Sequence, residues 1–136
     1  MLVHATCVAI GDVGVLLRGS PGSGKSDLAL RLIDGGAKLV ADDQVSIVAV
    51  SGLLQASAPE VLRGKIEVRG CGILEIPFQE IVSLRLAIDL VARADVPRLP
   101  EDSICDIGGL VLSLYRLHVF DPSCPAKVRS IATRLD

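Results

Sequence analysis

Eight consecutive residues near the N-terminus have the types and spacing of a phosphate-binding loop. Residues 19–26 run Gly-Ser-Pro-Gly-Ser-Gly-Lys-Ser and match the pattern G-x-x-x-x-G-K-[ST] at every fixed position. Glycines let the backbone curve so that successive N–H groups point at phosphate oxygens. The lysine supplies a positive charge for the outer phosphates, and the last serine hydroxyl is a ligand for Mg²⁺. The loop therefore predicts a nucleotide site formed by Gly19, Ser20, Pro21, Gly22, Ser23, Gly24, Lys25 and Ser26.

The segments on either side of the loop have the order that the motif requires. Residues 13–18 are short and aliphatic, which predicts a strand, and residues 26–34 predict a helix with one apolar face. Gly35-Gly36 follows and ends that helix. The alternative is a glycine-rich turn that matches by chance, and the strand–loop–helix order argues against it.

Two adjacent carboxylates follow the next predicted strand. Residues 37–41 are mostly apolar, and Asp42 and Asp43 come directly after them. Acidic residues at this place suit metal binding or acid–base chemistry, although aspartate also favours plain turns. Neighbouring side chains on an extended chain point in different directions, so we expect the two to have different roles. At most one of them need face the nucleotide.

After the phosphate loop and the aspartate pair, a third set of candidate site residues lies in the segment 64–77. Ile66 and Val68 alternate with Glu67 and Arg69, which predicts a strand that presents the two charged side chains on one face. Glycines at 70 and 72 bracket the next turn and indicate a close approach of the backbone to another part of the molecule. His4 stands near the start of the apolar run 3–10; a lone histidine is more often structural than catalytic.

The composition limits the class of protein. A chain of 136 residues, 50% of them hydrophobic, suits one domain over 1–136, and with 2% aromatic residues its core must be aliphatic. A net charge of −2 gives no large basic surface, so we expect no nucleic-acid partner. Charged residues interrupt every apolar run and the N-terminus lacks a signal-peptide pattern, so we expect no membrane partner. The four cysteines have no close spacing, which indicates reduced thiols and a cytoplasmic location.

The rest of the chain contributes mainly strands. Gly11-Asp12 predicts a hairpin turn between the run 3–10 and the strand 13–18. Further strands are expected at 44–50, 53–58, 83–92, 104–107 and 110–120, with a helix as the alternative for 83–92 because its alternation is not decisive. A final helix is expected over 124–135, capped by residues 121–123. We therefore predict an α/β fold with a mostly β, mixed sheet and few helices, unlike the repeating βαβ order of most phosphate-loop proteins.

Four features together resemble the catalytic domain of the HPr kinase/phosphorylase family, bacterial serine kinases of the sugar phosphotransferase system. They are His4, the loop 19–26, the run Leu-Val-Ala-Asp-Asp at 39–43, and the stretch 67–73, which looks like that family's E-x-R-G-x-G-[IL] motif. The phosphate loop is shared by many families, whereas the last two features are more specific. The resemblance covers about residues 1–78.

The resemblance implies a fold, an activity and roles for residues. It implies a P-loop kinase domain of the phosphoenolpyruvate carboxykinase-like type that uses ATP and Mg²⁺ to phosphorylate a serine of an HPr-like phosphocarrier protein, and that also phosphorolyses the phosphoserine. Asp42 would be the base with His4 beside it, Ser26 and Glu67 would hold Mg²⁺, and Arg69 would orient the phosphate or the motif. A homo-oligomer, a hexamer in this family, is implied by analogy.

Three departures from the family pattern leave alternatives open. The chain starts without the family's separate N-terminal domain, as in a compact proteobacterial form; Ser20-Pro21 replaces a frequent Asp-Ser; and the C-terminal region lacks an obvious glycine-basic loop. These leave open the protein substrate and the phosphorylase activity. One alternative is a small-molecule P-loop kinase or NTPase, with Arg93 and Arg98 as lid arginines. The other is a catalytically reduced ATP-binding regulatory module, for which an intact base would be unnecessary.

Overall fold

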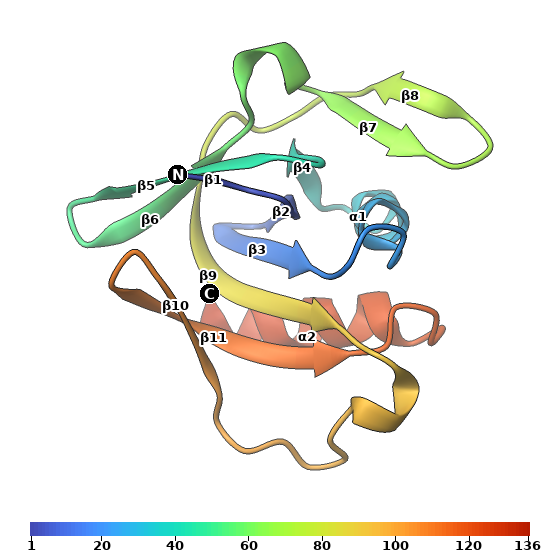
Figure 1. Ribbon diagram of the computed structural model, residues 1–136, viewed down its shortest axis with the longest axis vertical. Coiled ribbons are helices and arrows are strands. Elements are labelled where there is room, and N and C mark those ends of the chain that lie inside the picture. Colours follow the sequence, from blue (N-terminus) through green and yellow to red (C-terminus); the bar gives the residue numbers. More distant parts are fainter.

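Nine strands form one mixed sheet in the computed structural model, which describes residues 1–136 (Figure 1). The order is β1-β5-β6-β9-β3-β2-β4; β11 also pairs with β9, and β10 pairs with β11. The strands are β1 (Leu2–Val3), β2 (Thr6–Ile10), β3 (Val13–Arg18), β4 (Lys38–Ala41), β5 (Val45–Val50), β6 (Leu53–Ser57), β9 (Val82–Leu90), β10 (Ile104–Ile107) and β11 (Leu110–Leu117). The helices are α1 (Lys25–Asp34) and α2 (Cys124–Leu135), with short 3-10 turns at Glu60–Leu62 and Arg93–Asp95.

The centre of the sheet is a hairpin of β2 and β3 with β9 beside it. β2 and β3 pair antiparallel across the turn at Gly11, whose φ of 59° favours glycine. β9 then pairs parallel with both β3 and β11. All residues from Val13 to Leu17 are buried, because the sheet is covered on both faces here.

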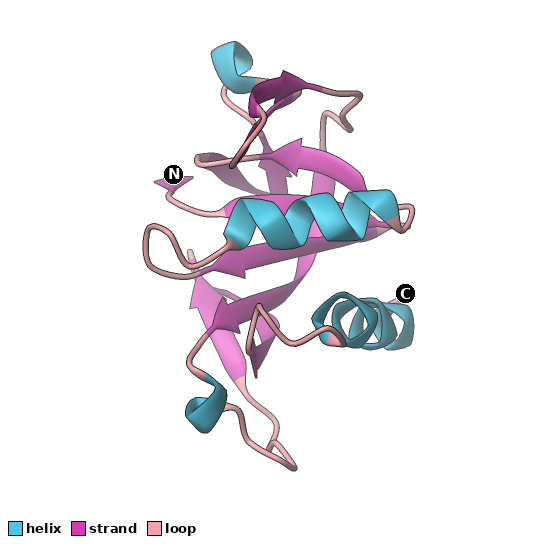
Figure 2. Ribbon diagram, turned by 90° about the vertical axis from the view of Figure 1, so that its right-hand side faces the viewer, coloured by secondary structure: helices cyan, strands magenta, loops and turns pink.

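The two helices cover one face of the sheet together. Leu28 and Leu32 of α1 and Val128 of α2 pack with Val15 and Leu17 of β3 in one apolar cluster. Figure 1 shows α2 behind β11 and α1 nearly end-on at the right of the sheet, and Figure 2 shows α1 running across the sheet. The apolar stripe predicted for residues 26–34 is thus the surface that fixes α1, and with it the end of the phosphate loop.

A second apolar cluster lies on the opposite face. It contains Leu16 of β3 and Ala87 of β9, together with Ile47 and Leu54 from β5 and β6. Successive side chains of a strand point to opposite faces, so Leu16 enters this cluster while Leu17 enters the other. The central strands therefore join two cores that aliphatic residues alone almost fill.

A separate hairpin of β7 (Lys65–Val68) and β8 (Gly72–Glu75) extends over α1 (Figure 1). Ile66, which is fully buried, belongs to the cluster that α1 forms with the sheet and fixes the hairpin there. Gly64 precedes β7 with a φ of 72°, and a Cβ on it would lie 2.9 Å from the carbonyl oxygen of Ile76. The alternation predicted for this stretch is confirmed, because Ile66 faces the core and Glu67 is exposed.

The mixed sheet with few helices is confirmed, and the structure refines three details. Residues 82–90 form a strand rather than the alternative helix. β11 ends at Leu117, so residues 118–121 belong to the turn before α2 and not to the strand. The expected side-chain cap of α2 is wrong, because Ser123 occupies the N-cap position but makes no capping hydrogen bond. Neither helix combines the length and apolar character that crossing a bilayer requires.

Candidate functional site

The predicted site residues meet at one edge of the sheet. β3, β9 and β11 run parallel, and their arrowheads point to the same side in Figure 1. β4 also ends at this edge, because β2 lies antiparallel to both β3 and β4. The phosphate loop, the aspartate pair and the turns after β9 and β11 are therefore neighbours. The tip of the β7–β8 hairpin completes this group from above α1.

A cleft of about 630 Å³ lies between these segments. Its volume suits a nucleotide-sized ligand. The lining residues are mostly polar or glycine: His4, Thr6, Pro21, Gly22, Gly24, Lys25, Ser26, Asp27, Asp42, Asp43, Glu67, Val68, Arg69, Gly70, Gly72 and Phe120. The sequence-predicted groups from four separate stretches thus share one cavity.

The loop has the backbone conformation that its glycines permit. Gly22 and Gly24 have φ values of 79° and 95°, a region that other residues rarely adopt. Gly24 is the N-cap of α1 and no side chain caps that helix, so the amides of its first turn face the cleft without a side-chain partner. Partial positive charge at a helix N-terminus favours phosphate.

Lys25 is held within the loop. Its side chain is buried, and Nζ donates hydrogen bonds to the carbonyl oxygens of Gly19 at 2.9 Å and Ser20 at 3.0 Å. These bonds fix the ammonium group beside the loop amides. The charge therefore stands where the outer phosphates of a nucleotide would be bound.

Asp42 is buried and accepts three hydrogen bonds. Its Oδ1 accepts from Ser26 Oγ at 2.7 Å and from Thr6 Oγ1 at 2.9 Å, and its Oδ2 accepts from the backbone N–H of Glu67 at 3.0 Å. The side chain is 5% exposed. Asp42 thus ties the phosphate loop, β2 and the β7–β8 hairpin to one carboxylate.

Asp43 has a different environment. Its backbone φ is 72°, an uncommon value for a residue other than glycine, and its side chain is 64% exposed at the cleft. His4 Nδ1 lies 3.4 Å from Asp43 Oδ1. The expectation that His4 sits beside Asp42 is therefore corrected: its partner is Asp43. His4 also lies in the bend between β1 and β2 rather than within a strand.

Glu67 and Arg69 both line the cleft from the β7–β8 hairpin. Both side chains are exposed, as the alternation of the strand predicts. Ser26, Asp42 and Glu67 offer oxygen donors only, which is the chemistry that Mg²⁺ prefers, and Mg²⁺ usually takes only one or two protein carboxylates. The residues present therefore fit a magnesium ion that is shared with nucleotide phosphates.

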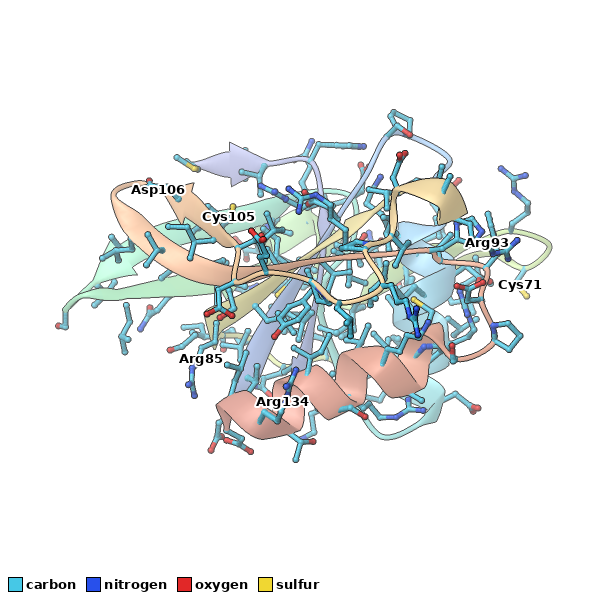
Figure 3. All side chains as sticks on the ribbon, turned by 90° about the horizontal axis from the view of Figure 1, so that it is seen from below. Cys71, Arg85, Arg93, Cys105, Asp106 and Arg134 are labelled. Carbon is cyan, nitrogen blue, oxygen red and sulfur yellow. The ribbon has the colours of Figure 1, made fainter.

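The turn after β11 forms the other wall of the cleft. The carbonyl oxygen of Val119 accepts a 2.6 Å hydrogen bond from Arg31 of α1. Arg93 donates to Asp121 Oδ1 at 3.0 and 2.9 Å, and this guanidinium lowers the pKa of Asp121. Arg93 lies at the same end of the molecule as Cys71 of the hairpin turn, opposite to Asp106 (Figure 3). Arg93 is thus engaged within the chain, whereas Arg98 does not line the cleft.

Several residues that line the cleft are not predicted as site residues by the sequence, among them Thr6, Asp27, Val68 and Phe120. Thr6, on β2, was not distinguished from its apolar neighbours, and Phe120 was assigned to a strand. Thr6 carries the one hydroxyl in a run of buried residues, and a polar side chain in such a run indicates a hydrogen-bonding role. Phe120 had no local signal, because its place depends on the parallel pairing of β11 with β9.

Comparisons with known proteins agree with this geometry. Residues 1–94 match the family described as HPr Serine kinase C-terminal domain. The chain is 41% identical over 110 residues to HPr kinase/phosphorylase of Thermoanaerobacter sp. (strain X514), covering 79% of this chain and 36% of that protein. It is 38% identical over 128 residues to HPr kinase/phosphorylase of Cupriavidus metallidurans, covering 86% and 40%. The chain thus spans less than half the length of these curated relatives.

A solved structure is similar over nearly the whole chain. The HPr(Ser) kinase/phosphatase from Coxiella burnetii superposes with a TM-score of 0.89 at 27% sequence identity. The match covers 99% of this chain and 95% of that one. It therefore includes the β10–β11 hairpin and α2, which lie beyond the residues that carried the resemblance in the sequence. The chain belongs to the HPr serine kinase C-terminal domain family.

Proposed function

We propose that this chain is an ATP-dependent protein-serine kinase that phosphorylates an HPr-like phosphocarrier protein. The observation that carries the proposal is the cleft in which a complete phosphate loop faces Asp42, Asp43, His4 and the β7–β8 hairpin. The names of the relatives and the family membership support the same activity.

The loop and the lysine bind the nucleotide in this proposal. Backbone amides of residues 22–26 surround the phosphates, and Lys25 neutralises charge on the outer ones. Ser26, Asp42 and Glu67 would hold Mg²⁺, which neutralises the charge that develops on the transferred phosphoryl group. Arg69, exposed beside Glu67, orients that group or the protein substrate.

For the catalytic base, the geometry favours Asp43 over Asp42, the residue assigned from the sequence. Both oxygens of Asp42 already accept hydrogen bonds, and the side chain is buried. Asp43 is exposed at the cleft, and its unusual φ is a form of strain that often marks functional residues. We therefore assign proton abstraction from the substrate serine to Asp43. His4 orients this carboxylate, and Asp42 positions Ser26.

The same groups support the reverse reaction. Inorganic phosphate would take the place of the β-phosphate of the leaving ADP and attack phosphoserine, with Asp43 accepting its proton. The phosphorus–oxygen bond to serine breaks, Asp43 returns the proton to the leaving serine oxygen, and the products are pyrophosphate and a free serine hydroxyl. No group beyond those of the forward reaction is required, as expected when catalysis rests on positioning and charge.

Self-association and location complete the proposal. A closed homo-oligomer, a hexamer by family analogy, would cover exposed apolar side chains at the end opposite to the cleft, among them Leu53, Ile104 and Val111. Light scattering should then give a mass several times the 14.3 kDa of one chain, and a mass of one chain would contradict the oligomer. We place the protein in the cytoplasm because its proposed substrates, ATP and a phosphocarrier, act there.

Incubation with labelled ATP, Mg²⁺ and purified HPr tests the activity directly. We expect phosphoserine on HPr, and none on an HPr whose acceptor serine is replaced by alanine. Transfer to free small acceptors instead of HPr would favour a small-molecule kinase. ATP binding with no transfer to either would favour a regulatory module.

A further inference from the structure

We infer that Phe120 is the stacking surface for the base of the bound nucleotide. The inference rests on the proposed function, because it takes the cleft to be the site of a nucleoside triphosphate. Nothing in the phosphate loop itself would bind the base, since its amides and its lysine serve the phosphates.

Phe120 is an unusual side chain for its surroundings. The chain has three aromatic residues of the Phe, Tyr and Trp types, and Phe120 is the one that lines the cleft. Its side chain is 63% exposed. The other hydrophobic lining residue, Val68, is partly buried against the core beneath the hairpin. A large aromatic surface is therefore presented to the cavity, where it would otherwise be in contact with water.

The turn that carries Phe120 is fixed on three sides. The carbonyl oxygen of Val119 is bound by Arg31, the carboxylate of Asp121 is bound by Arg93, and His118 Nδ1 lies 3.0 Å from the carbonyl oxygen of Val91. The rings of His118 and Phe120 meet edge to face at 5.8 Å and 74°. A ring held in one orientation loses little conformational entropy when a ligand stacks on it.

The turn also contacts the phosphate loop directly. A Cβ on Gly24 would lie 3.1 Å from Val119 Cγ2 and 3.6 Å from Phe120 Cζ. The ring thus stands beside the residue that begins α1, where the phosphates are bound. A base joined to those phosphates through a ribose can reach it.

The distribution of charge in the cleft sets the direction of the nucleotide. Asp42, Asp43 and Glu67 all lie on the side formed by β4 and the β7–β8 hairpin, and Ser26 hydrogen-bonds to Asp42 there. The metal and the outer phosphate belong on that side. The uncharged aromatic base then belongs on the opposite side, which is where Phe120 lies. Stacking on an aromatic ring is open to any base, because every base has a flat π-face, and it contributes substantially to affinity.

The experiment compares the binding of ATP with the binding of tripolyphosphate, which has the phosphates but no base. Calorimetry measures Mg-ATP and Mg-tripolyphosphate binding to the full chain and to Phe120→Ala, Phe120→Tyr and the control Val61→Ala, whose valine is exposed outside the cleft. We expect Phe120→Ala to weaken ATP binding by roughly 5- to 100-fold and to leave tripolyphosphate binding unchanged. Phe120→Tyr and Val61→Ala should retain the wild-type affinity for both ligands.

A second variant provides a spectroscopic signal for stacking. The chain has no tryptophan, so Phe120→Trp introduces a single tryptophan at the proposed contact, whose emission can be excited apart from that of Tyr115. We expect ATP, but not tripolyphosphate, to quench its emission. Equal ATP affinity in the wild type and Phe120→Ala, or equal quenching by both ligands, would overturn the inference. Failure of the wild type to bind tripolyphosphate would instead overturn the phosphate-loop proposal on which it rests.

Discussion

Asp42 and Asp43 are neighbours in the chain but have separate environments. Asp42 accepts three hydrogen bonds in a buried position, whereas Asp43 is exposed opposite His4. We expect Asp43→Asn to lower serine phosphorylation by roughly 10²- to 10⁴-fold, the usual effect of removing a positioned base. Mg-ATP affinity should be unchanged because the loop is untouched. Single-turnover transfer from labelled ATP measures the first quantity, and calorimetry the second.

Asp42→Asn is the matched comparison. It removes the charge that Ser26 and Thr6 contact, so we expect a higher Mg²⁺ requirement and a loss of protein stability together. Its Mg²⁺ titration should shift, and that of Asp43→Asn should not. If Asp42→Asn abolishes transfer with a normal Mg²⁺ titration while Asp43→Asn stays active, the base is Asp42, as the sequence alone predicted.

Lys25 contributes a charge that no other side chain of the loop supplies. We expect Lys25→Ala to weaken Mg-ATP binding by about 10- to 100-fold, because hydrogen bonds from charged groups contribute about 1.5–3 kcal/mol each. Lys38→Ala, on an exposed residue of β4, is the control and should bind normally. Unchanged ATP affinity of Lys25→Ala in calorimetry would contradict the phosphate-loop assignment.

At the scale of elements, Ile66 is the side chain of the β7–β8 hairpin that is fully buried in the core. Ile73 of the same hairpin is 69% exposed. We expect Ile66→Ala to cost about 2–5 kcal/mol, because it leaves a cavity at the base of the hairpin. Ile73→Ala should change stability by less than about 0.5 kcal/mol. Denaturant unfolding measures both values.

The hairpin also carries Glu67 and the amide that binds Asp42. Loss of Ile66 should therefore speed hydrogen exchange of the β7 and β8 amides more than that of β3. It should also raise the Mg²⁺ concentration that activity requires, because Glu67 is a proposed ligand of the ion. An Ile66→Ala variant whose hairpin amides exchange at the wild-type rate would show that other contacts hold this element.

For the whole molecule, the two apolar clusters are joined through the same strands. Leu16 and Leu17 are adjacent on β3, and each lies in a different cluster. We expect Leu16→Ala and Leu17→Ala each to lower the free energy of unfolding by about 2–5 kcal/mol, with one cooperative transition in each case. Thermal unfolding followed by calorimetry and circular dichroism tests this. Two separate transitions would mean that the two faces of the sheet unfold independently.

Several features of this protein follow from the sequence alone because they depend on neighbours in the chain. The phosphate loop needs glycines, a lysine and a serine at fixed spacing, and β3 and α1 follow from short apolar patterns. The alternation at residues 83–92 also gave the correct choice of strand over helix, although the strand itself is Val82–Leu90. The short range of these signals explains why they were sufficient.

Only the tertiary structure decided which side chains meet. The pairing of His4 with Asp43, the three donors around Asp42 and the placement of Phe120 all depend on how distant strands align. The alternation of a strand predicts which face of the sheet a side chain occupies, but not which side chain of a neighbouring strand lies beside it. Register and parallel pairing are set by packing of the whole sheet. The direction of a bound nucleotide across this cleft therefore could not be derived until the strands were placed.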